Sequence, residues 1–344
     1  MRSDLTFSTA HCPYLIALDW GTTSLRAYLM AHDGSVIEER TGGKGIMQVE
    51  DGRFTEALSA LCGDWLDAHP AATLIASGMI GSKQGWIEAP YCPCPANAVA
   101  LAAKMVTINI DIKAGGGTGA TAGATAGANA GAAVNASNVA NNLRPLHVVP
   151  GVSFTDPISG VPDVMRGEET QIIGAISASG AHLVVLPGTH SKWVWVQDGA
   201  ILRFSSWMTG EVYAALTQHT ILGRLMNLDA EHDDAAFMRG VRYGYANPAT
   251  LLHEIFSART LGLFGQLDSA ALPSYLSGLL IGTEIGGTLN KIDQTPAITI
   301  LGSSALTERY AIALEKCGIT TQAGSLNSAA QGLFRLARST SKVS

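Results

Sequence analysis

The fold is decided by residues 15–28, which read Leu15-Ile16-Ala17-Leu18-Asp19-Trp20-Gly21-Thr22-Thr23-Ser24-Leu25-Arg26-Ala27-Tyr28. An apolar strand leads to one acid, then to a turn of glycine and hydroxyl residues, then to a second strand. Gly21 lets the backbone pass close to a ligand, and the amides and hydroxyls of Thr22, Thr23 and Ser24 can hold phosphate oxygens. Asp19 ends the strand and suits Mg²⁺ with its waters. An ordinary hairpin has the same composition, so the motif needs support from elsewhere in the chain.

The same pattern occurs a second time at residues 183–196, which read LVVLPGTHSKWVWV. Each copy has, in one order, four apolar strand residues, a Gly-Thr-x-Ser turn, an alternating strand, an Asp-Gly turn and a third strand. The Gly-Thr-x-Ser turns lie at 21–24 and 188–191, the Asp-Gly turns at 33–34 and 198–199, and the third strands at 36–41 and 200–205. Five correspondences in one order predict a duplicated three-stranded unit.

Length, composition and charge restrict what the chain can be. Its 344 residues suggest two domains, and 47% hydrophobic residues can supply their cores. A net charge of −6 without a basic stripe argues against nucleic acid as a partner. The chain has no run of about 18 apolar residues and no apolar signal-peptide centre near its N-terminus. We therefore expect a cytoplasmic protein without a membrane partner and with reduced cysteines. The oligomeric state stays open, a homodimer included.

Periodicity and turn signals predict the remaining elements. We expect helices at 54–68, 211–225, 249–264, 274–292, 306–316 and 328–338, and strands at 73–76, at 297–301 and near Ile319. From 113 to 142 the composition is dominated by Gly, Ala, Thr and Asn, which cannot bury enough surface to offset the entropy of ordering. We interpret that segment as a flexible insertion, not as a phosphate loop. The expected domains are an N-terminal lobe at 13–148, which contains the insertion, and a C-terminal lobe at 149–338.

Three segments together resemble a known superfamily. The two Gly-Thr-x-Ser turns and the strand end Ile300-Leu301-Gly302-Ser303-Ser304 look like the nucleotide-contacting segments of the acetate and sugar kinase, Hsp70 and actin superfamily. The resemblance implies an α/β, two-lobed, duplicated actin-like ATPase (ribonuclease H-like) fold, with the two turns facing an interlobe cleft. It also implies that Gly302 and Ser303 hold the adenosine. The superfamily often has Gly-Gly there, and Ser303 departs from that pattern.

Longer strings make the resemblance more specific to the 2-dehydro-3-deoxygalactonokinase family. They are DWGTT at 19–23, ASGMIGS at 76–82, GWIEAPY at 85–91, PGV at 150–152, DVMRGEETQ at 163–171 and PGTHSKW at 187–193. The implied activity is ATP-dependent phosphorylation of a six-carbon sugar acid, 2-dehydro-3-deoxy-D-galactonate, at its terminal C6 hydroxyl, in galactonate catabolism. The implied cofactors are ATP and Mg²⁺, and the implied partners are small molecules.

Phosphoryl transfer needs phosphate donors, a metal-linked acid and an acceptor for the hydroxyl proton. Asp19 is the expected metal-linked carboxylate. The expected nucleotide contacts are Gly21, Thr22, Thr23, Ser24, Gly188, Thr189, Ser191, Lys192, Gly302 and Ser303. Lys192 is equally well interpreted as a strand-edge lysine. His190 is interpreted as a hydrogen-bonded structural histidine.

The proton acceptor is expected at the helix start that follows Gly167. Glu168 is favoured there, with Glu169 and Asp163 as alternatives. Two adjacent glutamates cannot point the same way on a helix, so we expect one to face the ligand and the other to cap. Acids in a first helical turn also favour the helix dipole without any catalytic role.

The expected substrate wall follows the strand at 73–76, where ligand contacts of α/β sheets gather. Its residues are Ser77, Gly78, Met79, Gly81, Gln84, Trp86 and Tyr91, with Arg166 to bind the sugar-acid carboxylate. Trp86 and Tyr91 also fit packed aromatics, and Arg166 also fits a surface ion pair.

Three other functions remain open at this stage. They are a kinase of another sugar or keto-deoxy sugar acid, a nucleotide-switched protein of the actin or Hsp70 kind, and an inactive sensor. The chain lacks room for the peptide-binding half of a chaperone. The intact Asp19, Glu168 and both turns argue against an inactive sensor.

Overall fold

The computed structural model describes residues 13–111, 143–289, 297–302, 305–325 and 327–340. The predicted insertion at 113–142 and Ser303 lie outside these residues. The chain divides into two compact units. Unit 1 is formed by residues up to Ser179, by Asp198–Leu202 and by the residues from Asn327 onward, and unit 2 by Gly180–Gln197 and Arg203–Leu326. Residues 149–179, which the predicted boundary places in the C-terminal lobe, belong to unit 1 in this division.

Unit 1 is built on a six-stranded sheet with the order β3-β2-β1-β4-β7-β6. The strands are β1 (Pro13–Trp20), β2 (Ser24–Ala31), β3 (Val36–Lys44), β4 (Thr73–Ser77), β6 (Val106–Asp111) and β7 (Leu143–Val148). Strands β1, β2 and β3 form the predicted antiparallel meander, and β1, β4 and β7 run parallel. Strand β6 returns antiparallel to β7 at the edge of the sheet.

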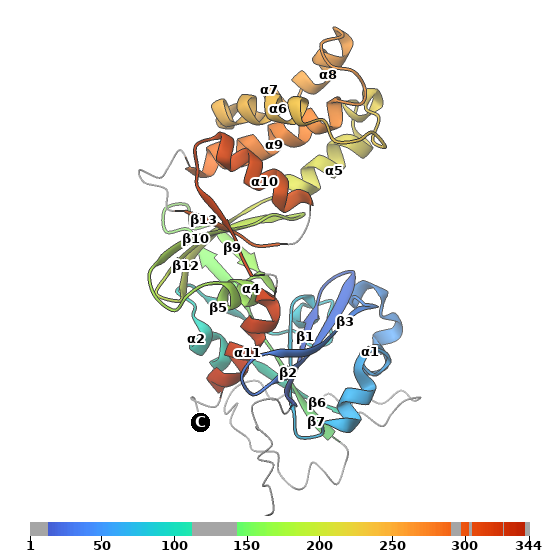
Figure 1. Ribbon diagram of the computed structural model, residues 1–344, viewed down its shortest axis with the longest axis vertical. Helices are drawn as coiled ribbons and strands as arrows, with labels where there is room; N and C mark the ends of the chain where they lie inside the picture. Colours follow the sequence, from blue (N-terminus) through green and yellow to red (C-terminus); the bar gives the residue numbers. More distant parts are fainter. Residues whose placement is uncertain (1–12, 112–142, 290–296, 303–304, 326, 341–344) are drawn as a thin grey trace, which may run out of the picture. The chain divides into compact units, whose positions relative to one another are not determined.

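Helices cover both faces of this sheet (Figure 1). The four residues 15–18 of β1 are fully buried, as expected for a central strand covered on both sides. Helix α1 (Phe54–Ala68) forms as predicted and packs against β2 and β3. Helix α11 (Ser328–Thr340) packs against β1 and β4 and crosses α4 (Glu168–Ala175). A Cβ at Gly174 would lie 1.8 Å from the Ser328 carbonyl oxygen, so the crossing requires glycine.

A small three-stranded sheet, which the sequence analysis did not predict, completes unit 1. Its order is β5 (Tyr91–Pro93), β8 (Gly151–Thr155) and β9 (Pro162–Met165). Helix α2 (Ala98–Ala103) follows β5 and is capped by Asn97. Strand β9 delivers the chain directly to the start of α4.

Unit 2 repeats the strand order of unit 1. Its sheet, of which only the first residues of β12 belong to unit 1, has the order β12-β11-β10-β13-β14, which matches β3-β2-β1-β4-β7 strand for strand. The strands are β10 (Ala181–Leu186), β11 (Ser191–Gln197), β12 (Ala200–Trp207), β13 (Ile298–Ile300) and β14 (Thr321–Ala323). Strand β10 is antiparallel to β11 and parallel to β13, as β1 is to β2 and β4. The predicted duplication is confirmed.

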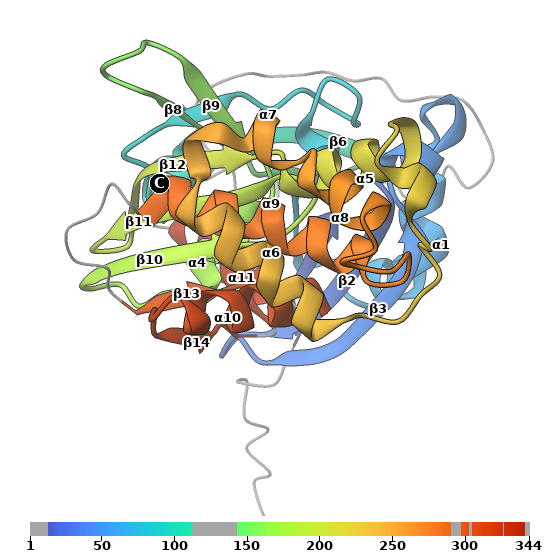
Figure 2. The same cartoon turned by 90° about the horizontal axis from the view of Figure 1, so that it is seen from above.

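Six helices occupy the described part of unit 2 besides its sheet. They are α5 (Thr209–His219), α6 (Asp234–Ala246), α7 (Leu251–Glu254), α8 (Ser257–Leu263), α9 (Leu272–Leu289) and α10 (Ala305–Lys316). Helices α6 and α9 lie side by side (Figure 2) and touch through glycines. The predicted helix at 211–225 ends at His219, the one at 249–264 is broken into α7 and α8, and α6 was not predicted. Among the described residues, no helix is long and apolar enough to cross a membrane.

Candidate functional site

The first Gly-Thr-Thr-Ser turn connects β1 to β2 and packs against the 3₁₀ turn η2 (Ile46–Gln48), which follows β3. The Gly21 carbonyl accepts the Ile46 N–H at 3.0 Å, and the Thr22 carbonyl accepts the Met47 N–H at 3.1 Å. A Cβ at Gly45 would lie 2.4 Å from the Thr22 carbonyl oxygen, so the chain behind the turn has no room for a side chain.

The side chains of this turn are exposed. Thr22, Thr23 and Ser24 are all exposed to solvent. The amides and hydroxyls of Thr22 and Thr23 have no hydrogen-bond partner among the residues that the structure describes. Unsatisfied donors on a rigid turn are the groups that an anion such as phosphate requires.

Asp19 lies at the carboxyl end of β1, in a row with two polar neighbours. It faces Arg26 across the β1–β2 pair and Ser77 across the β1–β4 pair. Burial raises the pKa of Asp19, the Arg26 charge opposes that rise, and the Glu168 charge adds to it. Asp19 and Glu168 are distant in sequence, but the effect of the Glu168 charge on the pKa of Asp19 indicates that the two acidic side chains lie near each other. Arg26 was missed as a site residue, although the opening stretch contains it.

Two glycines with positive φ allow the chain to close around Asp19. Gly78, with φ +93°, follows β4, and a Cβ there would lie 2.7 Å from the Trp20 carbonyl oxygen and 3.6 Å from Asp19 Oδ1. Gly167, with φ +107°, precedes α4, and a Cβ there would lie 3.2 Å from Gly78 Cα. Side chains rarely adopt these backbone angles, so both positions favour glycine. The corner after β4 and the corner before α4 therefore meet beside Asp19.

The two adjacent glutamates at the start of α4 differ in environment. Glu169 is fully buried, and its carboxylate accepts the Gly167 N–H at 2.7 Å and the Thr170 hydroxyl at 3.2 Å. Burial first, and the Glu168 charge second, raise the pKa of Glu169 to about 8. Glu168 is half-buried, and its Oε2 accepts the Arg166 N–H at 3.0 Å. Glu168 is thus the more accessible acid, and it lies close enough to Asp19 to affect its pKa.

Asp163, the third candidate for the base, lies on β9. It pairs with Phe154 in the small sheet, and its Oδ1 accepts the Val164 N–H at 2.7 Å. This places Asp163 four residues before the α4 corner, on a strand of a different sheet from Asp19.

Arg166 is enclosed rather than exposed. Its Nη2 donates to the Ala89 carbonyl at 2.8 Å, and its guanidinium carbon lies 4.5 Å from the centre of the Tyr91 ring. Its Nε and Nη1 are buried without a hydrogen-bond partner among the described residues. A Cβ at Gly81 would lie 3.0 Å from Nη1. The alternative of a surface ion pair is wrong, because Arg166 pairs with no acid in the described chain.

The other expected wall residues divide into buried and exposed positions. Ser77 is buried at the end of β4, and Met79 and Gly81 lie in a single 3₁₀ turn, η4 (Met79–Gly81). Gln84 and Tyr91 are exposed. The expected substrate wall therefore combines Ser77 and η4 with the exposed polar side chains of Gln84 and Tyr91.

Trp86 belongs to an aromatic cluster in the core of unit 1. Its ring stacks on Phe54 at 5.5 Å between centroids and meets the edge of Trp20 at 6.2 Å. Trp20 in turn donates its Nε1–H to the Lys44 carbonyl at 3.0 Å. The structure thus gives Trp86 the packing role that was its alternative interpretation.

The second Gly-Thr-x-Ser turn connects β10 to β11 and rests on the first turn of α5. The Thr189 carbonyl accepts the Glu211 N–H at 3.0 Å, and a Cβ at Gly210 would lie 2.6 Å from the Gly188 carbonyl oxygen. His190 is hydrogen-bonded to the Glu211 carboxylate, as its structural interpretation expected. Both turns are therefore supported by a closely packed glycine, Gly45 in unit 1 and Gly210 in unit 2.

Ser191 points into unit 2 and joins a buried network that the sequence analysis missed. Ser191 Oγ lies 2.8 Å from Tyr310 Oη, which donates to Glu284 Oε2 at 2.7 Å. Fully buried Glu284 also accepts from Trp193 Nε1 at 2.7 Å and from the Thr209 hydroxyl. Burial raises the pKa of Glu284, and these donors oppose the rise. No local pattern signals this network, because its members are up to 119 residues apart in sequence.

The remaining expected nucleotide residues lie in the sheet of unit 2. Lys192 is only 5% exposed, and β11 is an inner strand, so its interpretation as a strand-edge lysine is wrong. Gly302 follows β13 with φ +138°, and a Cβ there would lie 2.7 Å from Thr307 Oγ1. Ser303 lies outside the described residues.

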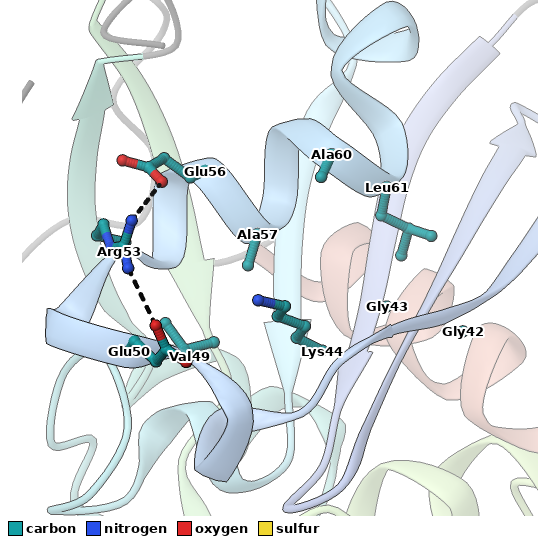
Figure 3. A pocket seen from close by; sticks show the side chains of 10 residues that line it. All are labelled: Gly42, Gly43, Lys44, Val49, Glu50, Arg53, Glu56, Ala57, Ala60 and Leu61. Atoms are coloured by element: carbon teal, nitrogen blue, oxygen red, sulfur yellow. Dashed lines mark hydrogen bonds and ion pairs between the residues drawn. The ribbon is translucent and has the colours of Figure 1, made fainter. Parts of the chain in front are cut away.

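A cavity of about 320 Å³ opens elsewhere in unit 1, between β3 and α1 (Figure 3). Lys44, Glu50, Arg53 and Glu56 supply its charged side chains, and Arg53 makes ion pairs with both glutamates at 3.3 Å and 3.6 Å. Its lining includes no predicted site residue. The charges of this cavity largely neutralise one another.

The acidic residues around Asp19 suit Mg²⁺, which is bound partly by substrate phosphates and waters, better than a metal ion bound by protein ligands alone. Within the described chain, no group of three or more His, Cys, Asp or Glu side chains could hold a metal ion. Magnesium is usually bound by one or two carboxylates together with substrate phosphates and waters. Asp19 with Glu168 nearby, next to the Gly21 turn, provides that smaller set.

Together these features define a class of protein. A twofold repeated strand order, with a hydroxyl-containing turn after the first strand of each copy and one acid in the first copy, is the actin-like ATPase fold to which sugar kinases belong. Within that class, the chain belongs to the 2-keto-3-deoxy-galactonokinase family, whose sequence model matches residues 19–336.

Individual relatives agree with this family. The chain is 33% identical to a protein of Rhizobium meliloti (strain 1021) assigned as a 2-dehydro-3-deoxygalactonokinase, over 94% of this chain and 97% of the relative. It is 30% identical to the 2-dehydro-3-deoxygalactonokinase of Escherichia coli (strain K12), over 90% and 92% of the two chains. A crystal structure of a Sinorhizobium meliloti protein with the same assignment superposes with a TM-score of 0.75, at 32% identity, over 94% and 98% of the chains.

Proposed function

We propose that the protein is a sugar-acid kinase, which transfers the γ-phosphoryl group of ATP to the C6 hydroxyl of 2-dehydro-3-deoxy-D-galactonate in the cytoplasm. The observation that carries this proposal is the family match over residues 19–336, which begins at the acid of the first turn. The products would be the 6-phosphate and ADP, as galactonate catabolism requires.

ATP phosphates would be held by the two Gly-Thr-x-Ser turns. The unpartnered amides and hydroxyls of Thr22 and Thr23 support this role in unit 1. The exposed Thr189 supports it in unit 2, whereas the Ser191 hydroxyl has an internal partner. We further propose that the adenosine binds near Gly302 and Ser303, after β13 in unit 2.

Mg²⁺ would be bound at Asp19, where it would neutralise charge on the transferring phosphoryl group. Asp19 holds a charge that burial and Glu168 both disfavour, so a cation at this corner would relieve that cost. Arg26, opposite Asp19 in the sheet, adds positive charge on the same face.

Glu168 would accept the proton of the C6 hydroxyl. It is half-buried beside Asp19, whereas Glu169 is sealed in the core with both oxygens hydrogen-bonded. Asp163 lies on another sheet and bonds its own neighbour. Positioning of the hydroxyl against the phosphate would supply most of the rate, with proton transfer adding to it.

The substrate carboxylate would be received at the Arg166 corner. Arg166 Nε and Nη1 have no acceptor among the described residues, and leaving buried guanidinium donors unsatisfied is costly. A carboxylate from the substrate would satisfy these donors after a small movement of the exposed Tyr91 ring that covers the guanidinium.

The proposal is tested by ATP turnover against a panel of sugars and sugar acids, with Mg²⁺ present and after its removal by a chelator. We expect Mg²⁺-dependent turnover with 2-dehydro-3-deoxy-D-galactonate to exceed that with every other member of the panel. Faster turnover of a different sugar acid would still indicate a kinase, but it would rule out the proposed substrate. A rate of ATP hydrolysis that no sugar or sugar acid changes would instead support a nucleotide-switched protein.

A further inference from the structure

The buried network around Glu284 connects the core of unit 2 to its phosphate turn by two routes. In the first, Glu284 accepts from the Thr209 hydroxyl at the start of α5. The next residue, Gly210, packs against the Gly188 carbonyl, and Glu211 donates its N–H to the Thr189 carbonyl at 3.0 Å. The first turn of α5, fixed by Glu284, is therefore the surface on which the phosphate turn rests.

The second route runs through Tyr310 to Ser191. A tyrosine hydroxyl has one proton, and Tyr310 gives it to Glu284. The Tyr310 oxygen therefore accepts the proton of Ser191, 2.8 Å away. Ser191 is fully buried and is the last residue of the turn. Because Glu284 accepts from Tyr310, each hydrogen bond of this route donates toward Glu284: Ser191 donates to Tyr310, and Tyr310 donates to Glu284.

The partners of Glu284 act on its charge state against the effect of burial. Trp193 Nε1 can only donate, and the Thr209 and Tyr310 hydroxyls both donate to the same carboxylate. These donated hydrogen bonds stabilise the ionised form and oppose the rise in the pKa of Glu284 that burial causes. An ionised acid that is fully buried is retained only where its hydrogen bonds offset the cost of desolvation.

We propose that Glu284 is a positioning residue for the nucleotide, which sets the geometry of the 188–191 turn from behind and never touches the ligand. This inference rests on the proposed ATP-binding function. It predicts that loss of the carboxylate weakens nucleotide binding while sugar-acid binding, which is proposed in unit 1, stays unchanged.

The test is Glu284→Gln, which keeps the shape of the side chain but replaces one acceptor oxygen by a donor. That donor would face the Tyr310 and Thr209 hydroxyls and would reverse the direction of the hydrogen bonds toward Ser191. We expect the ADP dissociation constant and the KM for ATP to rise by about tenfold, the usual effect of losing one hydrogen bond to a charged group. The KM for the sugar acid should stay within about twofold of wild type.

Glu254→Gln is the matched control. Glu254 is a second buried carboxylate of unit 2, on α7, where it accepts the Thr250 hydroxyl at 3.1 Å and has no link to the turn. Its replacement should leave both KM values unchanged. Tyr310→Phe removes the route to Ser191 and one donor to Glu284 but leaves the Thr209 route in place, and it should raise the KM for ATP by about threefold. Tyr310→Phe decides the question if Glu284→Gln does not fold.

The outcomes separate this inference from the function on which it rests. Wild-type affinity for ADP and ATP in Glu284→Gln, or in a folded Tyr310→Phe if the first variant is lost, would overturn the positioning role. An equal rise in both KM values would also overturn it, because that result indicates general loss of structure. If the wild-type protein itself binds no ADP, the proposed function fails first.

Discussion

At the scale of single residues, the proposed chemistry depends on acids whose environments differ within a few positions. Asp19, Glu168 and Glu169 are coupled electrostatically, yet only Glu169 is sealed from solvent. Burial separates their roles, because a group that cannot meet the substrate cannot exchange a proton with it.

Asp19→Asn should abolish most turnover. The amide keeps the shape of the side chain but loses the charge that a metal-linked ligand needs, so we expect kcat to fall by about 10³-fold or more, with an unchanged melting temperature. Steady-state kinetics and thermal melting measure both. Asp67→Asn, on the exposed surface of α1, is the control. Near-normal turnover of Asp19→Asn would remove Asp19 from the metal site.

The choice of base is tested by two neighbouring substitutions. Glu168→Gln should lower kcat by about 10²- to 10⁴-fold, the usual contribution of a general base. Glu169→Gln should retain most activity, because its carboxyl group makes only internal hydrogen bonds. Asp163→Asn serves as the third arm of the comparison. A fast Glu168→Gln enzyme would contradict the assignment, and a slow Asp163→Asn enzyme would transfer it.

Glu169 should make stability depend on pH. Its pKa is raised to about 8 in the folded protein, above the ordinary value of 4.5. The folded state therefore holds this proton more tightly than the unfolded state. The resulting stabilisation is complete below about pH 4.5 and is lost as the pH rises to about 8. We expect the wild-type melting temperature to fall over this range, and that of Glu169→Gln to fall less. Parallel pH profiles would contradict the shift.

At the scale of elements, each phosphate turn depends on the segment that supports it. Gly45 follows β3 and Gly210 opens α5, and neither leaves space for a Cβ. The two supports differ in secondary structure, although the turns they hold are related by the duplication. Close backbone packing, and not a particular element, is the shared requirement.

Gly45→Ala and Gly210→Ala should each displace their turn. A methyl group would meet backbone atoms at 2.4 Å in one case and 2.6 Å in the other, and backbone cannot move aside cheaply. We expect a rise in the KM for ATP of about tenfold and a lower melting temperature. Gly63→Ala in α1, where the nearest atom is 3.6 Å away, is the control and should not destabilise. Wild-type KM values in both turn variants would contradict the role of these supports.

The elements also show which features the sequence could predict. Alternating apolar residues and Asp-Gly turns define β1–β3 and β10–β12 locally, so both meanders were predictable. The short strands β5, β8 and β9 have three to five residues each, too few for a periodic signal. Helix α6 was missed, although Asp233 caps it through the Ala236 N–H at 2.8 Å. The pairing of Ser191 with Tyr310 depends on tertiary packing, which no local pattern contains.

At the scale of the whole molecule, the duplication gives one chain two proposed phosphate turns, and only the first copy has the proposed metal-linked acid. The position of Asp19 in the first copy corresponds to Leu186 in the second. The strand order is the same in both copies, so residue identity at this position distinguishes the copy for which we propose the metal site. Glu168 and Arg166 were predictable as site candidates from their strings, whereas the enclosure of Arg166 and the burial of Glu169 required the structure.

The predicted insertion can be tested by removal. Asp111 and Leu143 are direct partners at the ends of β6 and β7. Opposed residues of an antiparallel pair can be joined by a two-residue Asn-Gly turn, so residues 112–142 are replaceable by that turn. We expect the melting temperature to change by no more than about 3 °C and kcat/KM by no more than about twofold. A large loss of either would show that the segment contributes to structure or function.

The central claim is that this chain phosphorylates 2-dehydro-3-deoxy-D-galactonate at C6. The most direct measurement is NMR of the product formed from ATP, Mg²⁺ and this sugar acid, with Asp19→Asn as the inactive control. We expect a new phosphorus signal coupled to the C6 protons, formed by the wild type and absent with Asp19→Asn. A phosphorus signal coupled to any other position, or no sugar phosphate from the wild type, would contradict it.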